Sequence, residues 1–464
     1  MLGGAAALSA APALASDPGA GAAHAKRQAH PNIIYIMTDQ HSANALSCAG
    51  NPYLKTPNID RFAEHGVRFT NAYCAMPLSG PSRASMFTGY MPSEIGMNEN
   101  EMPLCDSLRN STLGSLVAQA GYECAYAGKW HVNTISLPSE HAFGFRNIKD
   151  NGDAGIADAC IGFLRGREGS STPFFLVASY TNPHNICEAA RGQKTPHADV
   201  SYSSPEKRPA LPENFAINAD DAKVLQFERR QNYSLYPSVD YADEDWINYR
   251  DIYFRLVEAV DAEIGKIVDE IDRQNLWDNT IVIFTSDHGD GQGAHHWNQK
   301  TVLYEEVANI PLIVCLPGGK NAGGVSEALV CNGVDLMPSL CDWAGARVPA
   351  GRTGVSIRPA CENPDSEMLR EYLVTETNFN QTGGTKGWLV RSSDYKYVVY
   401  DKGLHREQLF DMRSDRLEMH NLAESPEFRS VLDAHRKALR DWLSARSFPD
   451  KALRLKVSRP SGLE

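Results

Sequence analysis

Polar side chains follow four short apolar segments of the sequence, at the point where each segment ends. Short apolar runs of this kind are typical of buried strands. The polar groups after them are Asp39-Gln40, Lys129-Trp130-His131, Pro183-His184 and Asp287-His288. In open α/β sheets, ligands bind outside the carboxyl ends of the strands. The four groups together therefore predict a site for a metal ion and an anion at these strand ends.

The residue types at these ends include candidate metal ligands. Asp39 and Asp287 offer hard carboxylate oxygens and Gln40 offers a neutral oxygen, a set that suits Ca²⁺ or Mg²⁺. His288 is a softer ligand and favours zinc or manganese, so this chemistry leaves the metal open. A helix N-cap is the alternative for a single strand-end Asp, but it does not account for the whole set.

The segment from residue 79 to 89 is the second candidate element, with the sequence Ser-Gly-Pro-Ser-Arg-Ala-Ser-Met-Phe-Thr-Gly. Pro81 and Ser82 suit a first helical turn, so free backbone N–H groups are expected to point toward residue 79. A nucleophile there, beside Arg83, is well placed to attack an anionic ester. The alternative is a loop and a helix cap, with Ser79 or Ser82 as the capping residue.

Alternating strands and helices position these groups. Apolar strand patterns are found at 31–39, 67–73, 122–129, 173–180, 280–286 and 311–316, and helical patterns at 56–65, 112–120 and 243–274. This order predicts an α/β fold with a large mixed, mainly parallel sheet between helices. After about residue 365, short strand patterns at 372–375, 388–391 and 396–400 precede an amphipathic helix at 425–445. They predict a small antiparallel α+β subdomain.

The first 25 residues differ from the rest, because they are rich in Ala, Gly and Leu and end in alternating small residues that suit signal-peptidase cleavage. The apolar run is too short to span a bilayer, and the usual basic start is missing. A disordered tail is the alternative. We expect a signal peptide or disordered export segment at 1–30, a catalytic domain at 31–365 and a C-terminal subdomain at 366–464. The protein would then be periplasmic or secreted, without a transmembrane segment.

The composition excludes several classes of protein. The 464 residues carry a formal net charge of −12, which argues against nucleic acid as a partner. With 42% hydrophobic and 22% charged residues, the chain is neither disordered nor fibrous. Ten cysteines are scattered without a C-x-x-C pair, so a zinc ribbon or a disulfide scaffold is not expected.

Several of these motifs together resemble one known family. Ser79-Gly80-Pro81-Ser82-Arg83, followed by Thr88-Gly89, is similar to the signature of the formylglycine-dependent (type I) sulfatases of the alkaline-phosphatase-like superfamily. Later landmarks of the family are matched in the same order by Gly128-Lys129-Trp130-His131, Pro183-His184, Thr285-Ser286-Asp287-His288-Gly289, Lys300 with Tyr304-Glu305-Glu306, Gln408-Leu409-Phe410-Asp411 and Asn421-Leu422. The resemblance spans about residues 31–423.

The resemblance implies that Ser79 is converted to formylglycine (3-oxoalanine) by a sulfatase-maturating enzyme, and that the hydrate of this aldehyde is the nucleophile. A serine hydroxyl is poorly nucleophilic without a base, whereas an aldehyde hydrate can attack with one oxygen and expel sulfate through the other. A Ser rather than a Cys at this position resembles the bacterial branch of the family. An engineered replacement of Cys is the alternative.

The resemblance also implies a metal site in which Asp39, Gln40, Asp287 and His288 hold one divalent ion against residue 79. Ca²⁺ is expected, with Mg²⁺ or Mn²⁺ as alternatives. Many relatives have a second Asp where this chain has Gln40, so the site loses one negative charge and metal affinity should be somewhat weaker.

The remaining roles implied by the resemblance concern the nucleophile, the sulfate group and the leaving group. Arg83 should stabilise the ionised hydrate, and Lys129 and Lys300 should hold sulfate oxygens in the transition state. His131 should hydrogen-bond the hydrate, and His184 should be the general acid for the leaving oxygen.

Other readings of the site stay open. His295 and His296 either touch the leaving group or pack. A choline sulfatase or a phosphonate or phosphate ester hydrolase of the same superfamily shares the Asp-Gln pair, although Lys129-Trp130-His131 is typical of sulfatases. A catalytically dead protein that binds sulfated glycans would follow if Ser79 stays unmodified. For an enzyme, the acidic chain favours a small or chain-end carbohydrate sulfate over the interior of a long polyanion.

Overall fold

The computed structural model describes residues 30–196, 200–365, 369–379 and 384–446. The predicted export segment lies outside these ranges, except for residue 30. No helix among the described residues combines the length and the apolar composition needed to cross a membrane.

A large mixed sheet forms the centre of the molecule. Its strand order is β10-β2-β9-β8-β1-β7-β4-β6-β5. The central strands β8 (Thr280–Ser286), β1 (Asn32–Asp39), β7 (Phe174–Pro183) and β4 (Glu123–Gly128) are parallel neighbours. The antiparallel strand β9 (Leu312–Cys315) pairs with β8, and β6 (Phe145–Lys149) pairs with β4 in parallel. The prediction of a mainly parallel mixed sheet is confirmed.

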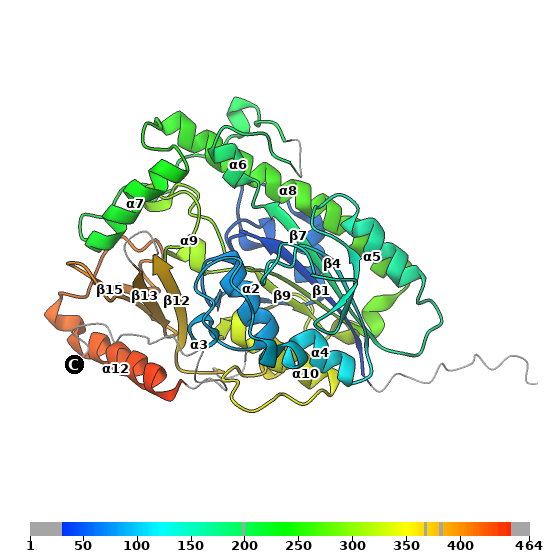
Figure 1. Ribbon diagram of the computed structural model, residues 1–464. Helices are drawn as coiled ribbons and strands as arrows, with labels where there is room; N and C mark the ends of the chain where they lie inside the picture. The colour runs from blue at the N-terminus through cyan, green and yellow to red at the C-terminus, as the bar shows by residue number, and fades with distance from the viewer. Residues whose placement is uncertain (1–29, 197–199, 366–368, 380–383, 447–464) are drawn as a thin grey trace, which may run out of the picture.

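Helices cover both faces of this sheet (Figure 1). Helices α1 (Pro57–His65), α5 (Ile156–Arg165) and α8 (Asp243–Arg273) lie on one face. Helices α2 (Ser79–Thr88), α4 (Leu113–Gln119) and α10 (Asn332–Ala344) lie on the other. Side chains of β1 alternate between the two cores, with Ile34 and Ile36 in the first and Tyr35 in the second. Both faces of β1 are therefore buried, which explains its unbroken apolar sequence.

A second, four-stranded antiparallel sheet forms the C-terminal part. It consists of β12 (Leu373–Phe379), β13 (Thr385–Arg391), β14 (Tyr395–Tyr400) and β15 (Glu407–Asp411). Helix α12 (Arg429–Ala445) buries Leu432 and Leu439 against it. The predicted small antiparallel subdomain is confirmed, and β15 is a strand that the sequence reading did not assign.

The remaining elements are short. They are the strands β2 (Val67–Phe69), β3 (Ala72–Tyr73), β5 (His141–Ala142), β10 (Gly324–Ser326) and β11 (Val330–Cys331), and the helices α3 (Pro92–Ile95), α6 (Ile186–Ala190), α7 (Lys223–Leu235), α9 (Glu305–Ala308) and α11 (Arg358–Glu362). The single strand predicted at 67–73 is thus two strands in two different sheets, since β2 pairs in the central sheet and β3 pairs with β11.

Candidate active site

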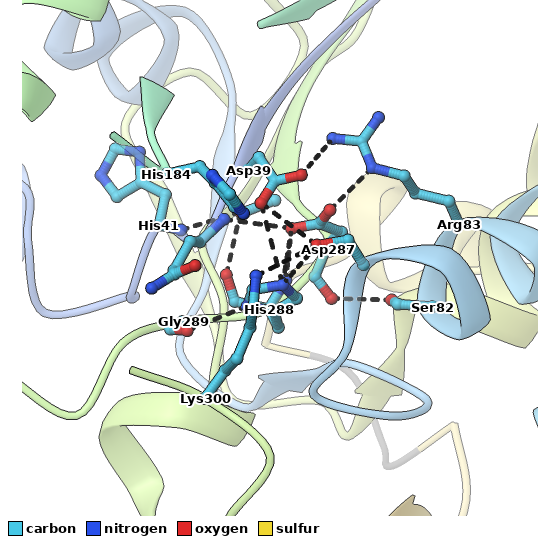
Figure 2. Close-up of polar contacts among 12 residues, drawn as sticks. Asp39, His41, Ser82, Arg83, His184, Asp287, His288, Gly289 and Lys300 are labelled. Carbon is cyan, nitrogen blue, oxygen red and sulfur yellow. Dashed lines mark hydrogen bonds and ion pairs between the residues drawn. The ribbon is translucent and has the colours of Figure 1, made fainter. Parts of the chain in front are cut away.

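The carboxyl ends of the four central parallel strands form the floor of the site. Because β8, β1, β7 and β4 are neighbours, Asp287, Asp39, His184 and Lys129, which end or follow them, come together. Asp39 and Asp287 are fully buried and Lys129 is 2% exposed. The strand-end reading of the sequence therefore located a real cluster of charged side chains (Figure 2).

Ser79 opens helix α2, two residues earlier than expected. Leu78 is the N-cap residue, the Ser82 N–H donates to the Leu78 carbonyl at 2.9 Å, and the Gly80 N–H donates to Asn100 Oδ1 at 2.9 Å. The expectation that these first-turn N–H groups are free and point at residue 79 is wrong, because protein oxygens accept from them. Ser82 does not cap the helix, since its hydroxyl donates to the Asp287 carbonyl at 2.7 Å.

Two basic side chains approach the paired aspartates from one side. Arg83 lies one turn after Ser79 on the same helix, and its Nε donates to Asp287 Oδ2 at 2.7 Å. Its Nη2 lies 3.2 Å from Asp39 Oδ2, and Lys129 Nζ lies 2.7 Å from the same oxygen. Burial alone would raise the pKa of Asp39, but the positive charges of Lys129 and Arg83 hold it well below its usual range. Asp39 is therefore an anion in the resting protein.

The other oxygens of the two aspartates face a shared point. The Ser79 hydroxyl donates to Asp39 Oδ1 at 3.3 Å, and His288 Nε2 lies 2.9 Å from Ser79 Oγ. His288 Nε2 also lies 3.8 Å from Asp39 Oδ1 and 3.7 Å from Asp287 Oδ1. In Figure 2, Arg83 reaches the carboxylates from the right, while His288 and Lys300 lie below them. Two carboxylate oxygens, one hydroxyl and one imidazole nitrogen fit the predicted divalent cation.

Gln40, the other predicted ligand, is held by its amide. Its backbone N–H donates to Asp287 Oδ1 at 3.1 Å, and its φ of 67° is left-handed. Its side-chain nitrogen donates to Asp290 Oδ2 at 2.7 Å and to Gln299 Oε1 at 3.1 Å. Both amide hydrogens are thus used, and the carbonyl oxygen lies 3.5 Å from the Cys187 sulfur.

Lys300 and the two remaining predicted histidines complete the site. Lys300 Nζ donates to Ser79 Oγ at 3.4 Å. Burial, together with Lys300 and Lys129, holds the pKa of His184 well below its usual range. Burial and Lys129 lower the pKa of His131 to about 3. Both imidazoles are therefore neutral at pH 7 in the unliganded protein.

His295 and His296 pack against other parts of the chain. The His295 ring stacks on Tyr304 with centroids 4.1 Å apart, and its Nε2 lies 3.2 Å from Asn214 Nδ2. The His296 ring stacks on Phe215 with centroids 3.9 Å apart, and its Nδ1 lies 2.7 Å from the Phe215 carbonyl. The His295 Nδ1 has no hydrogen-bond partner among the described residues. Because both rings are held by contacts with residues outside the catalytic cluster, we assign them no role in the reaction.

The sequence reading missed residues that support the site. Asp290 binds the Gln40 amide, Tyr249 hydrogen-bonds Asp290, and Ser179 accepts from Arg83. Tyr249 lies within the predicted helix at 243–274 and has the spacing of its apolar residues, and Ser179 lies inside the apolar strand predicted at 173–180. Of these three residues, only Asp290 could have been found from the sequence, because it lies two residues after His288.

Asp290 changes the charge balance expected from the sequence. The three basic residues of the site, Arg83, Lys129 and Lys300, are accompanied by three carboxylates rather than two. The third is Asp290, which is fully buried and accepts from the side chain of Gln40, the residue after Asp39. With neutral histidines, the formal charges of this cluster cancel. The described side chains of this cluster therefore carry no excess of positive charge.

Comparisons with known proteins agree with this geometry. A family model described as sulfatase matches residues 31–346, and one described as the C-terminal part of N-sulphoglucosamine sulphohydrolase matches residues 293–444. A Δ4,5-hexuronate-2-O-sulfatase from Bacteroides thetaiotaomicron is 30% identical over 441 residues, which cover 91% of this chain and 90% of the relative.

Two solved structures have the same fold. One, a 2-O GAG sulfatase, has a TM-score of 0.77 and 28% identity and covers 92% of this chain and 95% of its own. Another, solved with its substrate D-glucosamine-2-N,6-O-disulfate, has a TM-score of 0.71 and 25% identity and covers 90% and 98%. The matches include both sheets and every strand end that builds the site, and the chain therefore belongs to the sulfatase family and is a sulfuric ester hydrolase.

Proposed function

We propose that the protein hydrolyses a carbohydrate sulfate ester, at a chain end or on a small sugar, to an alcohol and inorganic sulfate. The observation that carries this proposal is that the two oxygens of each aspartate carboxylate have different neighbours. Arg83 and Lys129 occupy their Oδ2 atoms, while their Oδ1 atoms face Ser79 and His288. The relatives that act on sulfated hexuronate and glucosamine support a sugar as the substrate.

Residue 79 needs more than a serine hydroxyl. The nitrogen 2.9 Å from Ser79 Oγ belongs to His288, which the proposed metal site uses as a ligand and which is then unable to act as a base. When Ser79 has been converted to formylglycine, the hydrated aldehyde supplies an oxygen nucleophile without such a base. Arg83, within the same helix, favours the ionised form of a group at position 79.

Asp39, Gln40, Asp287, His288 and residue 79 would hold the divalent metal. Ca²⁺ fits their mainly oxygen donors, with Mg²⁺ or Mn²⁺ as alternatives. A bound cation would withdraw charge from a sulfate oxygen and so favour attack on sulfur.

Lys129 and Lys300 hold sulfate oxygens as negative charge develops. Lys300 is better placed for this, because its Nζ lies 3.4 Å from Ser79 Oγ and it makes no ion pair with any described carboxylate. An anionic sulfate next to His184 opposes the two lysines that depress its pKa. His184 then takes up a proton and donates it to the leaving oxygen, while His131 hydrogen-bonds the group at position 79.

We also propose that the protein is exported and is matured at Ser79 by a sulfatase-maturating enzyme. The net charge of −12 disfavours the interior of long sulfated polymers. Tight binding to heparin-like chains at low salt would contradict this substrate class.

Mass spectrometry of the peptide that contains Ser79, from protein coexpressed with a maturating enzyme, tests the mechanism. The expected result is the loss of two hydrogens, together with turnover of sulfated mono- and disaccharides. An unmodified and inactive protein from that source would contradict it and would favour a glycan-binding protein. A clear preference for an aryl phosphonate or for choline sulfate over sugar sulfates would instead favour the related hydrolases.

A further inference from the structure

Asp290 is a fully buried carboxylate without a cationic partner. Its side chain accepts hydrogen bonds from the Tyr249 hydroxyl at 2.8 Å, the Gln40 amide at 2.7 Å and the Gln292 N–H at 2.8 Å, all of which are neutral donors. Within the described residues, no Lys, Arg or His nitrogen forms an ion pair with it. A buried carboxylate that makes no ion pair is costly, so packing alone does not explain its place next to Gln40.

The hydrogen bonds of Asp290 fix the orientation of Gln40. Tyr249 accepts from the Gln299 side-chain nitrogen at 3.1 Å, so the Gln299 carbonyl oxygen faces Gln40. Asp290 and Gln299 therefore present only acceptors to the Gln40 side-chain nitrogen, and a flipped amide would set oxygen against oxygen. The Gln40 carbonyl oxygen is therefore the atom that does not face Asp290, and it lies 3.5 Å from the Cys187 sulfur, which is also 2.7 Å from Gln299 Oε1.

We propose that Asp290 is a positioning residue of the metal site, which acts through Gln40 and restores the charge that a glutamine ligand lacks. An amide that donates to a carboxylate carries more negative charge on its carbonyl oxygen, which strengthens that oxygen as a ligand. The negative charge that an aspartate at position 40 would carry is thus carried by Asp290 instead, one amide group further from the proposed metal ion. This inference rests on the metal ligands assigned in the proposed function.

Calcium titration of the unmodified Ser79 protein tests the proposal without relying on activity. Metal-free full-length protein, expressed without a maturating enzyme, is titrated with Ca²⁺ by isothermal calorimetry. Asp290→Asn should weaken Ca²⁺ binding about 10- to 100-fold, as is usual when the residue behind a metal ligand is changed. The double variant Q40D/D290N, which moves the carboxylate back to position 40, should recover most of that loss. A merely structural role of Asp290 predicts no recovery.

Two further variants distinguish an effect on the metal site from a general loss of folding. Tyr249→Phe keeps the packing of the ring but removes one hydrogen bond to Asp290, so a loss of a few-fold in affinity is expected. Asp261→Asn is the matched control, because Asp261 is a 2% exposed carboxylate that caps helix α1 instead. It should leave Ca²⁺ affinity unchanged.

The outcomes separate this inference from the proposed function. If Asp39→Asn abolishes Ca²⁺ binding while D290N and Y249F bind as the wild type does, the inference is wrong and the metal site stands. The same holds if Q40D/D290N binds no better than D290N. If D39N binds Ca²⁺ normally, the assignment of the metal site is itself wrong, and the proposed role of Asp290 is then also wrong.

Discussion

Two buried clusters of acidic and basic side chains both include residues of the segment 288–306, and they differ in how their carboxylates are used. The active-site cluster contains Asp39, Asp287 and His288, and the seam cluster, between the catalytic part and the C-terminal sheet, contains His295, Glu306 and Glu418. In each cluster, one histidine nitrogen and two carboxylate oxygens lie within 4.8 Å of one another. Spacing alone therefore gives both clusters the appearance of a metal site.

The seam cluster already contains its own cation. Lys396 Nζ lies 2.7 Å from Glu418 Oε1 and 3.0 Å from Glu305 Oε2, and the Glu305 N–H donates to Glu418 Oε2 at 2.6 Å. Both oxygens of Glu418 are occupied, so little is left for a metal ion. In the active site, by contrast, the basic residues occupy only the Oδ2 atoms of Asp39 and Asp287. The Oδ1 atoms accept hydrogen bonds from neutral donors, namely the Ser79 hydroxyl for Asp39 and two backbone N–H groups for Asp287. What distinguishes the two clusters is therefore which carboxylate oxygens a basic side chain reaches, rather than the spacing of the residues.

The largest effect is expected when one carboxylate of the active-site cluster is removed. Asp39→Asn should abolish measurable Ca²⁺ binding and lower kcat/KM of the matured enzyme by about 10³-fold or more, because a bound metal contributes several kcal/mol to the transition state. Glu306→Gln in the seam cluster is the matched change and should leave both quantities nearly unaltered. Calorimetry and a sulfate-release assay measure them. Loss of Ca²⁺ binding in E306Q would show that the seam cluster is a metal site and would break the comparison.

The second effect concerns the stability of the seam. Lys396→Met keeps the apolar stem of a fully buried lysine but leaves Glu305 and Glu418 without their ammonium group. The free energy of unfolding in urea should fall by about 3 kcal/mol, as for other buried ion pairs that lose one partner. The Ca²⁺ affinity of the folded protein should not change. A K396M protein that is as stable as the wild type would mean that the seam cluster does not depend on this cation.

The two clusters also show how far the sequence could predict the site. Asp39, Lys129, His184 and Asp287 were found because each one ends or follows an apolar run, and parallel neighbouring strands bring such residues together. The same periodicity predicted the central sheet, its covering helices and most of the C-terminal sheet.

Contacts between distant segments could not be predicted in this way. Lys396 is the first residue of the strand pattern at 396–400, and Glu418 belongs to no regular element, yet they meet in the seam cluster. Tyr249 has the spacing of a core residue. Only the structure shows that its hydroxyl also donates a hydrogen bond to Asp290 at 2.8 Å. Periodicity fixes which face a residue occupies, but not which polar atom its side chain meets there.

The third effect compares two buried lysines. Lys300 makes no ion pair with a described carboxylate and faces Ser79, whereas Lys396 is held between two glutamates. Lys300→Met should therefore lower kcat about 10²-fold, similar to the loss of one oxyanion donor, without the loss of stability expected for K396M. Single-turnover sulfate release and urea unfolding measure the two quantities. A K300M enzyme that is unstable but fully active per folded molecule would reverse the assignment of the two lysines.

The smallest effect is a dependence of stability on pH that arises in the seam. Burial, with Glu305 and Glu306 nearby, raises the pKa of Glu418 to about 8 although Lys396 opposes the shift, and burial keeps the neighbouring His295 neutral. Glu418 is thus protonated in the folded protein at pH values at which it is ionised in the unfolded chain.

The folded state binds the extra proton between the ordinary pKa of a glutamate and about 8, so stability is greatest below this window and is lost as the pH rises through it. Between pH 6 and pH 8.5, the free energy of unfolding should fall by about 2 to 2.5 kcal/mol. Glu418→Gln cannot titrate and should make this part of the profile flatter. A wild-type profile as flat as that of E418Q would show that Lys396 keeps Glu418 ionised, and the seam cluster would then be a simple buried ion pair.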